Sequence, residues 1–127
     1  MHELPITQSI LKIALRYAED AKAVRITNLY LRIGDLSSIV DDSVQFYWDI
    51  ISRDTIAEGA TLHFERLPMQ MICLDCGQTF YPTPGTFDCT VCGSQHVKVA
   101  GGDEFRLESI DIEQDETYND KTVDHLA

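Results

Sequence analysis

The four cysteines of this 127-residue chain stand in two pairs, written CLDCG and CTVCG. Twelve residues separate the pairs, and a glycine follows the second cysteine of each. A C-x-x-C turn directs two thiolates at one point, and the glycine lets the backbone curl around a metal ion. The spacing therefore predicts a tetrahedral site with four sulfur ligands: Cys73, Cys76, Cys89 and Cys92. No cysteine is left over for a disulfide framework, which favours a reducing compartment.

Zinc is the metal expected at this site, because closed four-thiolate cages in small ribbons are typical of structural zinc. The same ligands can hold iron in a rubredoxin-like electron-transfer site. Such a site needs an aromatic, apolar wrapping, which the segment QTFYPTPGTFD supplies only in part. Four protein ligands leave no open position for a substrate or an activated water, so the zinc is expected to be structural and the protein not to be an enzyme.

The distribution of charge argues against nucleic acid as a partner. The net charge is −11, and residues 103–127 carry nine acidic residues against two basic ones. Within residues 71–99 the only charged side chains are Asp75, Asp88 and Lys98, so the cysteine segment has no basic face for phosphate. No stretch approaches the roughly 20 apolar residues of a membrane span, and no basic and apolar leader precedes the first helix. We expect a cytoplasmic protein.

A second group with metal-binding chemistry is the N-terminal sequence MHE. Met1 is expected to remain, because methionine aminopeptidases spare a start methionine that precedes a bulky residue. The Met1 amine, the His2 amide and His2 Nδ1 can then close two chelate rings and place three nitrogens in one plane. Deprotonated amides favour square-planar Ni(II) or Cu(II), and a fourth position is left for the Glu3 amide or a donor from elsewhere. The alternative is that His2 is only a solvated terminal histidine.

Helices and strands must position these residues, and the hydrophobic pattern predicts four such elements with regular periodicity. Helices are predicted over residues 6–20, with Pro5 in the first turn, and from an N-cap at Asp41 or Asp42 through Ile51, with Tyr47 and Trp48 in the core. Strands are predicted over 24–33, with a bulge or burial on both faces, and over 61–67. A further strand at 104–113 follows the cysteine segment, which therefore resembles an insertion between neighbouring strands of one sheet.

The predicted fold is mixed α/β, with two helices on a small three-stranded sheet and an inserted zinc ribbon. The predicted domains are residues 1–69 plus 103–114 for the α/β domain that carries the terminal metal site, 70–102 for the ribbon, and 115–127 as an acidic, mobile tail. Among the other histidines, His96 is the one ribbon histidine that can reach toward a metal. His63 is expected on the surface, and His125 in the tail as a weak secondary metal ligand at most.

The order and spacing of these motifs resemble the HypA/HybF family of nickel metallochaperones over residues 1–113. The resemblance rests on MHE, LRIGDLSSI, EGATLHFERLP, the two CxxCG knuckles and LESIDIE. It implies nickel at Met1, His2 and Glu3 and structural zinc at the four cysteines. It also implies work with the GTPase HypB and delivery of nickel to the large subunit of [NiFe]-hydrogenase.

Three hypotheses follow from the residues and the resemblance. The first is a nickel metallochaperone for hydrogenase maturation. The second is a zinc-ribbon adaptor between proteins, which shares every feature except nickel chemistry at the terminus. The third is a rubredoxin-like redox module, which would be coloured as purified.

Overall fold

The computed structural model describes residues 3–115 and 123–125. These residues fall into two compact units. Unit 1 takes its described residues from the ranges 1–32, 38–65 and 106–127, and unit 2 from 33–37 and 66–105. In chain order the elements are α1 (Glu3–Asp20), β1 (Ala23–Gly34), α2 (Asp41–Ile51), β2 (Thr61–Leu67), β3 (Gln70–Cys73), β4 (Thr79–Phe80), β5 (Val97–Gly101), β6 (Phe105–Gln114) and β7 (Val123–His125).

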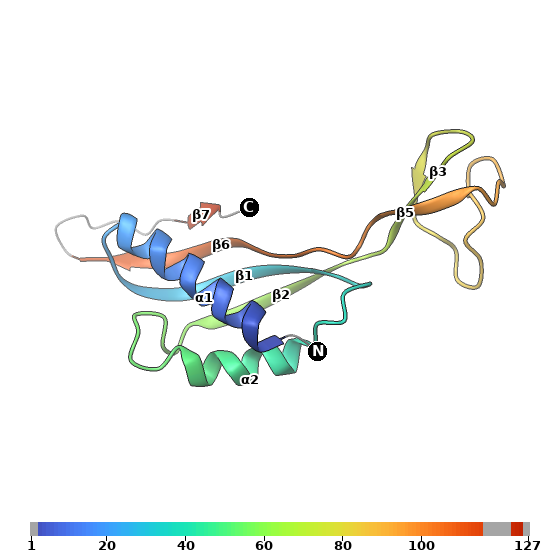
Figure 1. Ribbon diagram of the computed structural model, residues 1–127. Coiled ribbons are helices and arrows are strands. Elements are labelled where there is room, and N and C mark those ends of the chain that lie inside the picture. The colour runs from blue at the N-terminus through green and yellow to red at the C-terminus, as the bar shows by residue number, and fades with distance from the viewer. Residues whose placement is uncertain (1–2, 116–122, 126–127) are drawn as a thin grey trace. The chain divides into compact units, whose positions relative to one another are not determined.

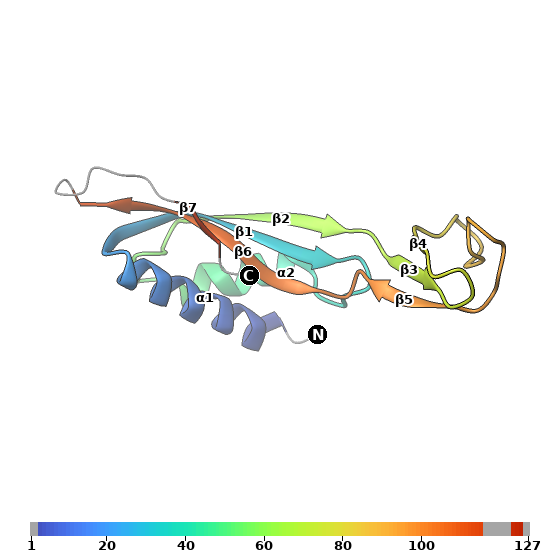
Figure 2. The same ribbon diagram turned by 90° about the horizontal axis from the view of Figure 1, so that it is seen from above.

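Unit 1 is a four-stranded sheet in the order β2-β1-β6-β7, with α1 and α2 together on one face (Figures 1 and 2). β1 and β2 run in the same direction, and α2 lies on the connection between them, as a parallel crossover requires (Figure 2). The core between helices and sheet is built from aliphatic residues and one tryptophan. Its members are Ile10, Ala14, Ala18, Ile26, Leu29, Leu31, Val44, Trp48, Leu62, Leu107, Ile110 and Ile112.

The structure confirms the mixed α/β class and both helices, with two differences in the sheet. β7 pairs antiparallel with β6, so the described part of the sheet has four strands where three are predicted. β2 and β6, which flank the ribbon in sequence, lie on either side of β1 and are not neighbours. The pattern of apolar residues identifies strands but carries no information on their order. Most of the predicted acidic tail, residues 116–122 and 126–127, lies outside the described residues.

The predicted cap of α2 is wrong by one residue. Val40 is the N-cap, in extended conformation, and its side chain makes no cap hydrogen bond. Asp41 and Asp42 instead lie in the first turn, where negative charge suits the positive end of the helix dipole. Trp48 is buried as predicted, whereas Tyr47 is only half-buried.

Unit 2 is a three-stranded sheet in the order β4-β3-β5 with a small core of Met71, Cys73, Phe80 and Cys89. Residues 33–37 join this unit through backbone hydrogen bonds: Gly34 N–H donates to Glu104 O, and Leu36 N–H donates to Gly102 O, both at 2.7 Å. The C-terminal end of β1 thus belongs to unit 2, although the hydrophobic run of β1 is continuous.

Gly34 lies so close to the Gly102 backbone that no side chain fits. A Cβ at Gly34 would lie 1.9 Å from the Gly102 carbonyl oxygen. Because backbone must move to relieve this clash, Gly34→Ala is expected to lower the free energy of unfolding by ~3 kcal/mol. Urea denaturation measures the loss. Gly101→Ala is the matched control, since its Cβ would meet its nearest neighbour at 3.7 Å. Equal unfolding midpoints for the two variants would contradict the prediction.

Candidate metal centre

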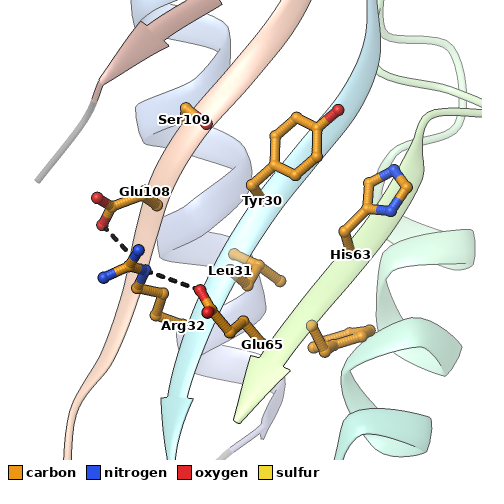
Figure 3. Close-up of a pocket in the computed structure, with 8 residues that line it drawn as sticks. Tyr30, Leu31, Arg32, His63, Glu65, Glu108 and Ser109 are labelled. Atoms are coloured by element: carbon orange, nitrogen blue, oxygen red, sulfur yellow. Dashed lines mark ion pairs between the residues drawn. The ribbon is translucent and has the colours of Figure 1, made fainter. Parts of the chain in front are cut away.

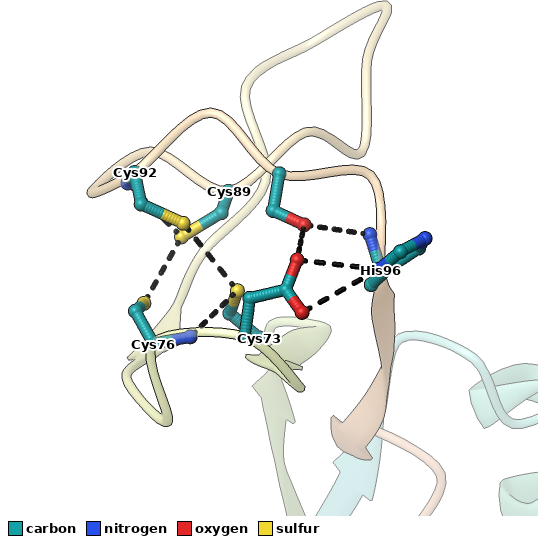
Figure 4. Close-up of polar contacts among 7 residues, drawn as sticks. Cys73, Cys76, Cys89, Cys92 and His96 are labelled. Carbon is teal, nitrogen blue, oxygen red and sulfur yellow. Dashed lines mark hydrogen bonds and ion pairs between the residues drawn. The ribbon is translucent and has the colours of Figure 1, made fainter.

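The four cysteine sulfurs converge in unit 2, as the spacing predicts. Cys73 and Cys76 come from the end of β3 and the turn after it, while Cys89 and Cys92 come from a second turn before β5. All four Sγ atoms lie within 4.8 Å of one another, with 3.6 Å between Cys73 and Cys92 and 3.7 Å between Cys76 and Cys89 (Figure 4). A tetrahedral ion with Zn–S bonds of about 2.3 Å has sulfur–sulfur edges of about 3.8 Å. The cysteines therefore fit a zinc ion, and none of them forms a disulfide.

The two turns have the same local geometry. Gly77 N–H donates to Cys73 O and Gly93 N–H to Cys89 O, both at 2.9 Å, and the two glycines have φ angles of 76° and 79°. Only this left-handed conformation returns the chain toward the first cysteine, which is why a glycine is needed after each pair. The first cysteine of each turn is buried and the second exposed.

Backbone hydrogen bonds stabilise the thiolate form of the first cysteine in each turn. Cys76 N–H donates to Cys73 Sγ at 3.4 Å, and this bond lowers the pKa of the Cys73 thiol to about 6. Cys92 N–H donates to Cys89 Sγ at 3.4 Å and lowers the pKa of Cys89 in the same way. The Ser94 N–H lowers the pKa of Cys92, but the contact with the Cys73 sulfur and burial outweigh it and raise this pKa to about 12. These hydrogen bonds favour the thiolate form of the first cysteine in each turn, and a cation bound by the four sulfurs would favour it in all of them.

A polar cluster that the sequence patterns do not reveal connects the two turns. Ser94 Oγ donates to Asp75 Oδ2, and Ser94 Oγ also accepts a hydrogen bond of 3.0 Å from His96 N–H. His96 Nδ1 lies 3.2 Å from Asp75 Oδ2, and its side chain is 77% exposed (Figure 4). The hydrogen bonds from Ser94 and His96 lower the pKa of Asp75. His96 therefore contacts the loop of the first cysteine pair and not the sulfurs.

The N-terminal candidate is described only from its third residue. Met1 and His2 lie outside the described residues, so their predicted role in nickel binding remains a prediction. Glu3 begins α1 and is 8% exposed. Its Oε2 accepts a hydrogen bond of 3.1 Å from Val40 N–H at the start of α2. The structure thus places a carboxylate beside the N-terminus of α2, an arrangement that the sequence pattern did not indicate.

The outer face of the sheet in unit 1 carries a second polar cluster. His63 is exposed, as predicted. Its ring stacks on Tyr30 with 4.7 Å between the ring centroids, and its Nε2 lies 2.8 Å from Asn28 Oδ1. Tyr30 OH donates to Asp111 Oδ2 at 2.7 Å, which raises the pKa of Tyr30. Nearby, Arg32 lies between Glu65 and Glu108 beside a hollow of ≈ 280 Å³ (Figure 3). These groups interact with one another across three strands.

Comparison with known proteins gives a consistent result. Residues 1–112 match the family described as "Hydrogenase/urease nickel incorporation, metallochaperone, hypA". The chain is 41% identical to hydrogenase maturation factor HypA of Dehalococcoides mccartyi over 115 residues, which are 91% of this chain and 97% of that protein. Its fold resembles a solution structure of HypA protein with a TM-score of 0.73 at 23% identity, covering 88% of this chain and 96% of that one. The solution structure of the Ni metallochaperone HypA from Helicobacter pylori gives a TM-score of 0.66 at 21% identity, over 91% and 100% of the two chains.

Proposed function

Because this chain belongs to the HypA family of nickel-incorporation metallochaperones, we propose that it binds Ni(II) at its N-terminus and delivers it for maturation of [NiFe]-hydrogenase. The proposed nickel ligands are the Met1 amine, the His2 amide and imidazole, and the Glu3 amide. The observation that carries this proposal is the family match from residue 1, which includes MHE. The proposed partners are the GTPase HypB and the large subunit of the hydrogenase, and the proposed location is the cytoplasm.

We propose structural zinc for the four cysteines. The support is the sulfur–sulfur distances of 3.6 and 3.7 Å, which match the edge of a zinc tetrahedron. With four thiolates on one ion no position is left for cargo, and amide nitrogens suit nickel better than zinc. The two metals are therefore proposed to occupy different parts of the chain.

The test of the nickel site compares native protein with His2→Ala. Loss of the imidazole removes one donor and one chelate ring, so nickel affinity is expected to fall by at least ~100-fold, the upper end of what loss of an outer-shell partner costs. Isothermal titration of the untagged protein measures the change. His63→Ala is the matched control, because it removes the imidazole of an exposed histidine on the sheet. Equal affinities of native protein and His2→Ala would leave the zinc-ribbon adaptor as the better account.

Nickel binding is also expected to weaken as the pH falls from about 7 to about 6, the range in which an ordinary imidazole gains its proton. The sign follows from the chemistry: the imidazole and the Met1 amine must be neutral to bind and the amides must lose their protons, so protons compete with Ni(II) and nickel affinity falls as the pH falls. Titrations at pH 7.5 and pH 6 measure the difference. An affinity that is the same at both values would exclude the imidazole as a ligand.

A further inference from the structure

Glu3 is buried in a way that an acidic residue rarely is. The buried face of α1 is formed by residues spaced three and four apart: Glu3, Thr7, Ile10, Ala14 and Ala18. Glu3 is thus the first member of the stripe that packs against the rest of unit 1, and only 8% of it is exposed. Carboxylates are almost never buried to this degree unless they are paired or hydrogen-bonded. The position of Glu3 therefore calls for a function of its side chain inside the fold.

The contacts of Glu3 identify that function. Its Oε2 accepts the Val40 N–H at 3.1 Å, and Val40 is the N-cap of α2, with no cap hydrogen bond from its own side chain. A carboxylate at this place accepts a hydrogen bond from the backbone N–H of Val40. It also complements the positive end of the α2 helix dipole. The Glu3 carbonyl is held as well, because the hydroxyl of the fully buried Thr7 donates to it. The Thr7 bond thus fixes the Glu3 backbone within α1, and the Val40 bond joins the Glu3 side chain to α2, where the first turn of α1 lies beside the start of α2 (Figure 1).

We propose that Glu3 is a positioning residue for the nickel site: its carboxylate anchors the start of α1 to the start of α2 and does not ligate nickel. This inference rests on the proposed nickel site at the terminus. The peptide nitrogen of Glu3 follows His2 directly, so fixing Glu3 fixes one end of the segment that wraps the ion. Ordering that segment in advance lowers the entropy lost when nickel binds.

Two variants separate positioning from ligation. Glu3→Gln keeps an oxygen that can accept the Val40 N–H, whereas Glu3→Ala keeps none. Nickel affinity is expected to stay within about twofold of native for Glu3→Gln and to fall about tenfold for Glu3→Ala, the factor set by one hydrogen bond to a charged acceptor. The d–d absorption of the nickel-saturated protein should be the same in both variants. A Glu3→Gln variant as weak as Glu3→Ala, or with a shifted absorption band, would overturn the proposal.

A double variant tests whether Glu3 acts only through the stability of the fold. Val40→Ser introduces an N-cap side chain, which is expected to restore the α2 start without Glu3. In Glu3→Ala/Val40→Ser the melting temperature should recover while nickel affinity stays reduced. Recovery of nickel affinity together with the melting temperature would overturn a positioning role.

His2→Ala, measured in the same series, distinguishes this inference from the proposed function. If His2→Ala binds nickel as the native protein does, the terminal site itself is wrong, and the inference falls with it. If His2→Ala loses nickel and Glu3→Ala does not, the terminal site stands and the positioning role of Glu3 is wrong.

Discussion

A run of four alanines added ahead of Met1 is expected to weaken Ni(II) binding by at least ~100-fold, although every side chain of the protein is retained. The extension moves the free amine out of chelating range of His2 and puts a peptide nitrogen in its place. The chelate ring that joins the Met1 amine to the His2 amide is then lost, and square-planar coordination loses one of its planar nitrogens. Titration calorimetry measures the affinity, and visible absorption reports whether a square-planar complex still forms.

The matched control is the same run of four alanines added after Ala127. It changes the length and mass equally but leaves the Met1 amine free, so its nickel affinity should equal that of the native chain. Native-like binding by the N-terminally extended protein would show that the Met1 amine is not a nickel ligand.

Cys73→Ser is expected to have the largest effect on the fold. Serine is close to cysteine in size but supplies no thiolate, and Cys73 is 1% exposed in the core of unit 2. Binding of a structural zinc ion contributes on the order of 10–16 kcal/mol to the folding of zinc-finger peptides. The variant should therefore lose its zinc and the ordered structure of unit 2, while the helices of unit 1 persist. Elemental analysis measures the zinc, and nuclear magnetic resonance reports the order of each unit.

Thr90→Ala is the control for this prediction, because Thr90 lies between Cys89 and Cys92 and is exposed. It should keep one zinc ion and an ordered unit 2. Removal of zinc from the native protein by a chelator should reproduce the effect of Cys73→Ser. A unit 2 that stays folded without zinc would contradict a structural role, since its remaining core of Met71 and Phe80 would then suffice.

The cluster of four cysteines was the most predictable part of the molecule. Ligand geometry at a C-x-x-C turn is local: the glycine after each pair and the N–H bonds to sulfur follow from the sequence of a few residues. Both helices could also be predicted from nearby residues, because apolar residues at a spacing of three and four mark a buried face. The start of α1 at Glu3, before Pro5, was not predicted, since the pattern of apolar residues begins only at Ile6.

What could not be predicted depends on contacts between distant residues. The hydrogen bond from Val40 to Glu3 joins positions 37 apart, and neither residue is of a type that indicates the other. The close approach of Gly34 to Gly102 brings together two glycines that are far apart in the sequence. Nothing in the sequence around either glycine indicates the other. β7 could not be predicted for the same reason. A three-residue strand forms only where a partner strand, here the edge of β6, is available to pair with it.

In the proposed function the two metals are separate: nickel would be carried by backbone and imidazole nitrogens at the terminus, and zinc by sulfurs in unit 2. This separation gives each metal the donors that suit it. It also allows nickel to be released without loss of the ribbon, because the two ligand sets share no residue.

The most direct test is elemental analysis of the untagged protein before and after incubation with Ni(II) and removal of unbound metal. One zinc ion per chain is expected in the protein as purified, and one nickel ion should be gained afterwards with the zinc retained. Nickel that displaces zinc in equal amount, or a chain that gains no nickel, would rule out separate sites for the two metals.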